Sequence, residues 1–328
     1  MKKSKVLVAG KLFDDLHETL LGRYDLVSNQ ADEVLEPATL ARLMADREAA
    51  VVTPVDRVDA ALLEAAPQLS IVCNIAVGYN NIDLGACTAR KVVVTNTPGV
   101  LDETTADLGF ALLLAAARRV VESDRWVRGG HWQAWRTTAW MGRDVHHARL
   151  GILGMGRIGQ AIARRAAGFA MDVVYHNRSR LAPELEQACS ARYVDKDQLL
   201  ETSDFVLLCL PYTPATHHTI GIAELQCMRS DAVLVNIGRG GLIDDAALIE
   251  ALRARRIAAA GLDVFENEPL LQRGFFDLDN VVLTPHIGSA SLATRRAMCE
   301  LALQNLHAAL SGAVPPNILN PQVLGARP

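Results

Sequence analysis

Long apolar segments are missing from this sequence of 328 residues. No run approaches the roughly 20 apolar residues that a bilayer-spanning helix needs, so we expect no membrane segment. Blocks of Lys and Arg are missing too, and the net charge is −4, which argues against nucleic acid as a partner. The six cysteines are scattered without a C-x-x-C pair. We therefore expect no metal site, no disulfide and a reducing, cytoplasmic environment.

Aromatic residues are scarce, at 5% of the chain, yet all four tryptophans fall between positions 126 and 140. They belong to a segment, residues 123–148, in which polar and aromatic side chains are mixed. Such mixtures are common at subunit contacts. We predict that this segment is a dimerisation arm, and the alternative is a surface arm whose tryptophans pack on their own domain.

Half of the residues are hydrophobic, which is ample for buried cores, and the length fits about two domains. The first hundred residues alternate strand-like and helical patterns, with apolar strands expected at 5–10, 24–29, 49–54, 69–76 and 92–97. Five such strands separated by helices predict a parallel, doubly wound sheet. One long helix is expected over residues 101–122.

The alternation of strands and helices returns after residue 148 with six further apolar strands, which predict a second doubly wound domain of the Rossmann type. This domain should be inserted into the first, because the helix at 101–122 leaves the first domain and the final helix, 292–310, returns to it. We therefore predict an α/β chain with a flavodoxin-like substrate domain at 1–100 plus 289–328. The nucleotide-binding domain should span 101–288.

The most informative stretch is RLGILGMGRIGQ at 149–160, which reads as a strand, a glycine turn and the start of a helix. Gly154, Gly156 and Gly159 have the G-x-G-x-x-G spacing. Gly154 allows the tight turn, Gly156 lets a pyrophosphate approach the backbone, and Gly159 lets the helix pack closely. The helix N-terminus then favours phosphate groups. We predict a dinucleotide site here rather than a turn without a ligand.

The end of the next strand indicates which dinucleotide binds. An NAD site usually carries Asp or Glu there, about 20 residues after the glycines. Asn177, Arg178 and Ser179 instead offer hydrogen-bond donors for a 2′-phosphate. One charge-assisted hydrogen bond is worth roughly 1.5–3 kcal/mol, so the sequence predicts NADPH as the cofactor, with NAD possible but weaker.

Three later strand ends carry polar side chains without an obvious structural need, namely Arg239, Glu268 and His286. Because they follow successive strands of a parallel sheet, all three can face one crevice. Arg239 lies between Gly238 and Gly240, and its planar guanidinium suits bidentate binding of a carboxylate. Glu268 can orient His286 and hold its proton. We predict that the three form a catalytic triad.

Two other features receive simpler predictions. Val77 and Gly78 follow the strand at 69–76, and Gly78 could let a backbone N–H reach a small ligand. The adjacent histidine pairs at 146–147 and 217–218 are expected to be structural or surface residues.

These motifs resemble those of the D-isomer-specific 2-hydroxyacid dehydrogenases. The likeness covers nearly the whole chain and rests on GMGRIG (154–159), NIGRG (236–240), GLDVFENEP (261–269) and PHIGS (285–289). Within the family the chain is most similar to the bacterial glyoxylate/hydroxypyruvate reductase B group, also described as 2-ketogluconate reductases. One departure is Asn80, where that group usually has an acid, and it could retune the substrate loop.

The resemblance implies NADPH-dependent reduction of small 2-oxo acids, such as glyoxylate, hydroxypyruvate and 2-ketogluconate, to D-2-hydroxy acids. His286 would donate the proton to the carbonyl oxygen with support from Glu268. Arg239 and the backbone of Val77 and Gly78 would bind the substrate carboxylate. A homodimer is also implied. Two alternatives stay open, namely 2-keto-6-phosphogluconate or another 2-oxo acid as substrate, and a nucleotide-sensing binding protein of the same fold.

The residues expected to contact the cofactor cluster at the glycine turn and at the strand ends of the nucleotide domain. They are Thr105, Gly154, Met155, Gly156, Arg157, Ile158, Gly159, Asn177, Arg178, Ser179, Leu210, Pro211, Thr216, Ile237, Gly238, Arg239, Asp263, His286 and Gly288. Of these, Asp263 is expected near the nicotinamide amide.

Overall fold

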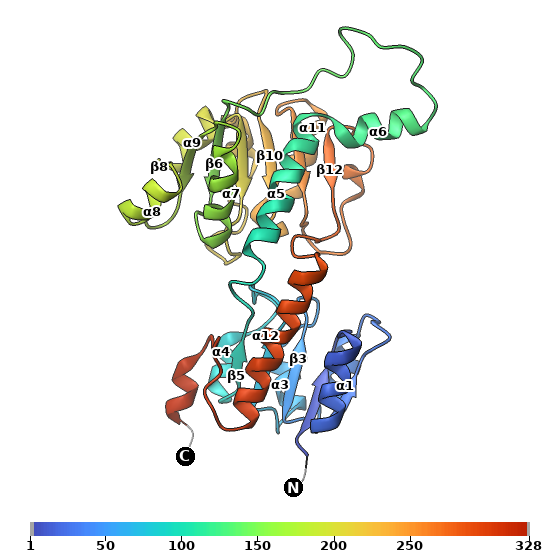
Figure 1. The fold of residues 1–328 in the computed structure, drawn as a ribbon, viewed down its shortest axis with the longest axis vertical. Coiled ribbons are helices and arrows are strands. Elements are labelled where there is room, and N and C mark those ends of the chain that lie inside the picture. Colours follow the sequence, from blue (N-terminus) through green and yellow to red (C-terminus); the bar gives the residue numbers. More distant parts are fainter. Residues whose placement is uncertain (1–2, 327–328) are drawn as a thin grey trace. The chain divides into compact units, whose positions relative to one another are not determined.

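The computed structural model describes residues 3–326, and the chain divides into two compact units. One unit contains the chain through Leu101 together with the segment from Ser291 onward, and the other spans Asp102–Ala290. Each unit is a parallel β-sheet flanked by helices (Figure 1). The predicted fold class, an α/β protein with two doubly wound parallel sheets, is confirmed.

The sheet of the first unit has five parallel strands in the order β2-β1-β3-β4-β5, which is the flavodoxin-like order. Its strands are β1 (Lys5–Val8), β2 (Asp25–Ser28), β3 (Ala49–Val52), β4 (Ile71–Asn74) and β5 (Val93–Thr95). Its helices are α1 (Asp14–Arg23), α2 (Pro37–Met44), α3 (Ala60–Ala65), α4 (Leu84–Ala89), α12 (Leu292–Leu310) and the short 3-10 helix η3 (Pro321–Ala326). Every residue of β3 and β4 is buried, as expected for a sheet that is covered on both faces.

The second unit has seven parallel strands in the order β12-β11-β10-β9-β6-β7-β8. Its strands are β6 (Arg149–Leu153), β7 (Asp172–His176), β8 (Ala191–Tyr193), β9 (Phe205–Leu208), β10 (Val233–Asn236), β11 (Ala259–Leu262) and β12 (Val281–Leu283). Its helices are α5 (Asp102–Ala117), α6 (Val120–Arg128), α7 (Arg157–Ala167), α8 (Pro183–Ala188), α9 (Lys196–Thr202), α10 (Ile222–Cys227), α11 (Asp245–Arg253) and the 3-10 helices η1 (Gly240–Leu242) and η2 (Arg273–Phe275).

Successive residues of these strands feed two separate apolar cores. Ile152 of β6 and Val235 of β10 pack with residues of α5 and α7, whereas Leu153 and Leu234 pack with residues of α9, α10 and α11. The alternation follows from the two-residue period of a strand. Since all strands run the same way, their carboxyl ends share one edge of the sheet and their amino ends share the other.

Side-chain caps fix where several helices begin. Asp59, Asp83, Asp195, Asp244 and Ser291 each accept a hydrogen bond from the backbone N–H three residues further on. Such a cap contributes about 1 kcal/mol to helix stability. The loops before these helices are therefore held in one conformation.

Two predicted elements were wrong. The nucleotide sheet has seven strands rather than six, because the short edge strand β8 was missed. The single helix expected at 101–122 is two helices, α5 and α6, which are separated at Arg119. Arg119 has φ of 55°, a left-handed conformation that an α-helix cannot continue through.

The segment from Arg119 to Arg143 begins and ends beside the C-terminal end of α5. At its start, Arg119 forms two hydrogen bonds with Glu122, of 2.8 and 2.7 Å. At its end, the N–H of Arg143 donates to the carbonyl of Ala117 at 2.8 Å, and Gly142 packs so closely on that carbonyl that a Cβ atom would collide with it. The two ends of this segment therefore meet.

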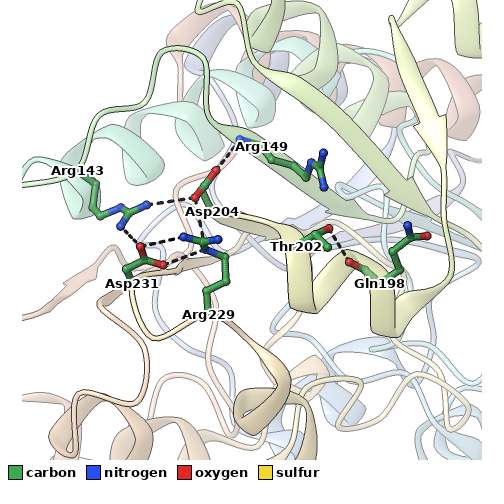
Figure 2. A network of polar contacts seen from close by, with 7 residues as sticks. All are labelled: Arg143, Arg149, Gln198, Thr202, Asp204, Arg229 and Asp231. Atoms are coloured by element: carbon green, nitrogen blue, oxygen red, sulfur yellow. Dashed lines mark hydrogen bonds and ion pairs between the residues drawn. The ribbon is translucent and has the colours of Figure 1, made fainter.

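A charged network joins the amino ends of three strands (Figure 2). Asp204, just before β9, accepts from the N–H of Arg149 at 2.8 Å and from Arg143 at 3.2 Å. Asp231, before β10, pairs with Arg143 and, at 3.0 Å, with Arg229. Each charge has partners of the opposite sign, so this edge of the sheet is held together by its own side chains.

Among residues 3–326, no helix combines the length and the apolar character needed to cross a membrane.

Candidate active site

The glycine turn after β6 has the geometry that its spacing predicts. Gly154 has φ of 103°, and a Cβ atom there would lie 2.8 Å from the backbone N of Leu210. Gly159 packs directly against the carbonyl of Gly154, where a side chain would not fit. Beside Gly156 no atom lies within 4 Å of a Cβ position, so this point of the backbone is open to an approaching group. Only glycine allows this combination of tight turn and close approach.

The helix that follows the turn presents free N–H groups. Gly156 is the N-cap of α7, and no side chain caps that helix end within the described chain. The N–H of Met155 is taken by Asn177 Oδ1 at 2.7 Å, which ties the turn to the end of β7. Below the turn, the Cys209 thiol donates to the carbonyl of Gly154 at 2.9 Å. An open backbone with free N–H groups at a helix N-terminus fits the pyrophosphate of a dinucleotide.

The loop after β7 contains one paired and one unpaired arginine. Arg180 forms two hydrogen bonds of 2.8 Å with Glu186, and Tyr175 donates to the same carboxylate at 2.6 Å. The bonds from Arg180 and then Tyr175 lower the pKa of Glu186 to about 2. Arg178 is exposed, and its side chain has no ion pair or hydrogen bond within residues 3–326. Arg178 and Ser179 are therefore available to a ligand, while Asn177 already holds the glycine turn.

The structure brings Glu268 and His286 into direct contact. They follow the neighbouring strands β11 and β12, and His286 Nδ1 lies 2.8 Å from Glu268 Oε2. The other carboxylate oxygen, Oε1, accepts from the N–H of Phe265 at 2.8 Å. Nε2 of His286 has no partner in the described part of the chain. One ring nitrogen is thus held by a carboxylate, and the other is left for chemistry.

The electrostatics of this pair favour an ionised carboxylate. Burial raises the pKa of Glu268, but the hydrogen bond and charge of His286, the N–H of Phe265 and the charge of Arg239 together bring that pKa below its ordinary value. His286 has φ of 53°, a left-handed conformation that is uncommon outside glycine. Backbone held in this region is often found at functional positions.

Arg239 follows β10, the strand next to β11. Its Nη1 donates to the carbonyl of Gly238 at 2.7 Å. Burial lowers the pKa of the Arg239 guanidinium, and the charge of Glu268 opposes that change. An arginine that is partly buried and close to a carboxylate is a candidate anion-binding group. The three predicted catalytic side chains therefore come from adjacent strand ends of one sheet.

Asp263 shapes the loop that carries His286. It is 1% exposed, and its carboxylate accepts hydrogen bonds from Thr284 Oγ1 and the N–H of Ile287, both at 2.7 Å, and from the N–H of Gly288 at 2.8 Å. Burial raises the pKa of Asp263, and these donors oppose the rise. The structure thus places Asp263 under the His286 loop, a role that its position in the sequence did not reveal.

Six other residues that were predicted to contact the cofactor lie in three contacting pairs. A Cβ atom on Gly288 would lie 3.3 Å from Thr105 Cγ2. One on Gly238 would lie 3.0 Å from the carbonyl oxygen of Leu210. Thr216 Oγ1 donates to the carbonyl of Pro211 at 2.8 Å.

Val77 and Gly78 belong to the first unit and follow β4. Side chains bind both of their carbonyl groups, since Asn96 donates to Val77 O at 2.8 Å and Asn74 donates to Gly78 O at 2.9 Å. Within the described residues, the two N–H groups have no acceptor. This loop is therefore held through its carbonyls while its N–H groups stay available.

Residues 110–288 match the family model described as the NAD binding domain of D-isomer specific 2-hydroxyacid dehydrogenases. The chain belongs to this family. It is 45% identical to a glyoxylate reductase of Thermococcus onnurineus over 99% of this chain and 98% of that protein. It is 46% identical to a glyoxylate/hydroxypyruvate reductase B of Escherichia coli over 98% of this chain and 99% of that protein.

A solved structure of similar fold is the NADPH-dependent glyoxylate/hydroxypyruvate reductase of Sinorhizobium meliloti in complex with NADP and malonate. The TM-score is 0.86 at 33% identity, and the match covers 97% of each chain. The protein is thus an oxidoreductase of the 2-hydroxyacid dehydrogenase family, as the sequence motifs predicted.

Proposed function

We propose that the protein reduces small 2-oxo acids, such as glyoxylate, hydroxypyruvate and 2-ketogluconate, to D-2-hydroxy acids with NADPH. The observation that carries the proposal is the 2.8 Å contact between His286 and Glu268 beside the partly buried Arg239. The relatives named glyoxylate reductase and glyoxylate/hydroxypyruvate reductase support the choice of substrates.

When bound, the dihydronicotinamide would supply a hydride to the C2 carbonyl carbon. His286 then gives the proton from Nε2 to the carbonyl oxygen, because Nδ1 is engaged by Glu268. The ionised Glu268 stabilises the protonated imidazole before that transfer. Arg239 binds the substrate carboxylate. Proton donation of this kind contributes roughly 10²–10⁴-fold to the rate.

Several residues would hold the cofactor. Gly156 and the N-terminal turn of α7 would bind the pyrophosphate, because the backbone at Gly156 is open and no side chain caps this helix end in the described chain. Gly154 would make the tight turn that precedes them. Arg178 and Ser179 would bind the 2′-phosphate, because both side chains are exposed. Residues 177–180 include no acidic side chain that would repel the phosphate. This arrangement supports NADPH over NADH.

A homodimer through α6 and the arm that follows it is also proposed. Trp132 and Trp135 are 64% and 79% exposed, so these rings find little cover within their own chain. By contrast, Trp126 and Trp140 pack on each other with ring centroids 5.4 Å apart. The arm therefore combines internal packing with an exposed apolar face, which suits a subunit contact.

The first experiment is NADPH oxidation by the purified protein with glyoxylate, hydroxypyruvate, 2-ketogluconate and its 6-phosphate, repeated with NADH and with His286→Ala. We expect turnover that prefers NADPH and falls about 10²–10⁴-fold in His286→Ala. His307→Ala is the matched control, because His307 pairs with Tyr24 in the other unit at 2.7 Å.

Two results would contradict the proposal. Binding of NADPH without turnover of any acid would favour a nucleotide-sensing protein of the same fold. Equal use of NADH and NADPH would show that Arg178 and Ser179 do not select the cofactor.

A further inference from the structure

A second polar network lies beside the predicted catalytic residues. His218 Nε2 lies 2.7 Å from Glu266 Oε1, two residues before Glu268. Glu266 and Asp245 are joined twice, since the N–H of Glu266 donates to Asp245 Oδ2 at 3.0 Å and the N–H of Asp245 approaches Glu266 Oε2 at 3.4 Å. Asp245 is 2% exposed and Glu266 is half-buried, so these groups are largely removed from water.

This network contacts the loop that carries Arg239. The N–H of His218 donates to the carbonyl of Gly241 at 2.8 Å, from a left-handed backbone with φ of 49°. Next to Arg239, Gly240 packs directly on the peptide that joins Phe265 to Glu266, where a Cβ atom would overlap the backbone. The loops after β10 and β11 are therefore in contact without an intervening side chain.

The preceding peptide, which joins Val264 to Phe265, contacts Glu268. The N–H of Phe265 donates to Glu268 Oε1 at 2.8 Å, and the other oxygen of that carboxylate holds His286. The network therefore fixes the peptide between Phe265 and Glu266, and Phe265 in turn holds the carboxylate that binds His286. A shift of this peptide would move Glu268 relative to Arg239.

A metal ion is a second way to use these side chains, because ligand atoms of His217, His218 and Glu266 lie within 4.8 Å of one another. The two imidazole rings, however, stack with centroids 3.7 Å apart and planes only 25° from parallel. Nitrogen lone pairs lie in the ring planes, so those of the two stacked rings lie in nearly parallel planes and do not converge well on one ion. The geometry favours the histidine–carboxylate pair.

We propose that His218, Glu266 and Asp245 are positioning residues of the active site. They fix the peptide between Phe265 and Glu266, and so keep Glu268 and His286 aligned with Arg239. This inference rests on the proposed function, in which those three side chains act on the substrate. Misplacement by about 1 Å can cost about 10²-fold in rate, so a network remote from the substrate can still govern kcat.

The test compares Glu266→Ala with Glu266→Gln and with a matched control, Glu224→Ala. Glu224 is also half-buried and bonds one side chain, Lys196 at 2.7 Å, and one backbone N–H, that of Gly221 at 3.0 Å. It touches neither catalytic loop. The glutamine can accept from the N–H of Asp245 and donate to a neutral His218, so it preserves both contacts. Rates are measured with EDTA present to exclude a metal effect.

We expect Glu266→Ala to lower kcat with glyoxylate about 10- to 100-fold while the KM for NADPH stays unchanged. Glu266→Gln should recover most of that loss, and Glu224→Ala should keep the full kcat. Glu266→Ala and Glu224→Ala should melt at similar temperatures. The proposal is overturned if the kcat of Glu266→Ala equals that of Glu224→Ala.

Hydrogen–deuterium exchange separates this proposal from the proposed function. In Glu266→Ala, peptides covering residues 263–270 should take up deuterium faster than in the wild type, whereas Glu224→Ala should leave them unchanged. If the wild type reduces no 2-oxo acid, the proposed function fails and this readout still tests the network. Unchanged uptake in Glu266→Ala would show that the network does not hold the loop.

Discussion

The seven-stranded sheet has charged groups at both edges, and the two edges use them differently. At the amino edge, Asp204 and Asp231 are shared among Arg143, Arg229 and the backbone of Arg149 (Figure 2). At the carboxyl edge, His286 binds Glu268 through one nitrogen and leaves the other without a partner in the described chain.

Left-handed backbone occurs at both edges, so it does not distinguish them. At the amino edge, His147 and Ala170 precede β6 and β7 and have φ of 62° and 52°. His218, Asn267 and His286, all at the carboxyl edge, have φ of 49°, 58° and 53°. Left-handed residues of this kind cost roughly 1–3 kcal/mol each and persist only where surrounding contacts enforce them. The comparison teaches that charge alone does not mark a site. Incomplete pairing marks it better.

Among the tests that compare the two edges, the largest effect is expected from replacing Arg239 at the carboxyl edge by lysine, with Arg143 at the amino edge as its counterpart. Arg239→Lys should lower kcat/KM for glyoxylate about 100-fold, because lysine cannot bind a carboxylate through two N–H groups and each charged hydrogen bond is worth roughly 1.5–3 kcal/mol. Arg143→Lys should leave kcat/KM unchanged. Steady-state kinetics of both variants decide this, and an equal loss in the two would erase the distinction between the edges.

A smaller effect is expected from substitutions in the loop after β7. This loop also has one arginine without a partner in the described chain, Arg178, and one paired arginine, Arg180. Arg178→Ser should reduce the preference for NADPH over NADH about tenfold, since one charged contact with the 2′-phosphate is lost. Arg180→Ser should change the preference little, because Arg180 is bound by Glu186 at 2.8 Å. The ratio of kcat/KM for the two cofactors is the measurement. A larger change in Arg180→Ser would reverse the assignment.

The edges should also respond to pH in opposite directions. Burial raises the pKa of Asp245 to about 7, above its ordinary value of 3.8, so its contribution to stability is complete below pH 3.8 and is lost as pH rises to about 7. Bonds from Arg229, and secondarily Arg143, lower the pKa of Asp231, so its contribution is present above pH 3.8 and is lost as pH falls through the lowered value.

Thermal melts of Asp245→Asn and Asp231→Asn test this difference. Relative to the wild type, Asp245→Asn should gain roughly 2 kcal/mol between pH 5 and pH 8, because asparagine never ionises. Asp231→Asn should show a constant deficit over that range, which shrinks only below about pH 4. A parallel pH response of the two variants would contradict the opposite shifts.

The smallest effect is expected from Asp204→Asn at the amino edge. This substitution weakens one acceptor in a network whose other contacts remain. The free energy of unfolding should fall by about 1 kcal/mol, which lowers the melting temperature by roughly 2–4 °C. The kcat should stay at the wild-type level. Loss of activity at an unchanged melting temperature would show that this edge takes part in catalysis.

The sequence was sufficient to predict the two sheets and the strand-end residues. Continuous apolar runs mark buried parallel strands, and the spacing of Gly154, Gly156 and Gly159 marks the turn, because both signals are local. The edge strand β8 escaped because it has three residues and only one of them is buried. The break at Arg119 escaped because left-handed φ is set by what packs around the residue, and the flanking residues are ordinary helix formers.

The positioning groups could not be predicted for a different reason. Asp263, Asp245 and His218 act through contacts with residues 21 to 48 positions away. The sequence contained one local hint, the alternation of Glu266 and Glu268 after an apolar strand, but nothing in it paired Glu266 with His218. Long-range partners of this kind follow from the strand order, which the pattern alone does not give.

The return of the chain at Arg143 to the carbonyl of Ala117, at 2.8 Å, has a consequence for how this fold can vary. The intervening segment enters and exits through one point, so its length can change without any strain on the sheet. A short turn between Ala117 and Arg143 would close the chain as well as the natural segment does. The segment is therefore an insertion whose length and sequence can be changed independently of the strands that carry the predicted catalytic residues.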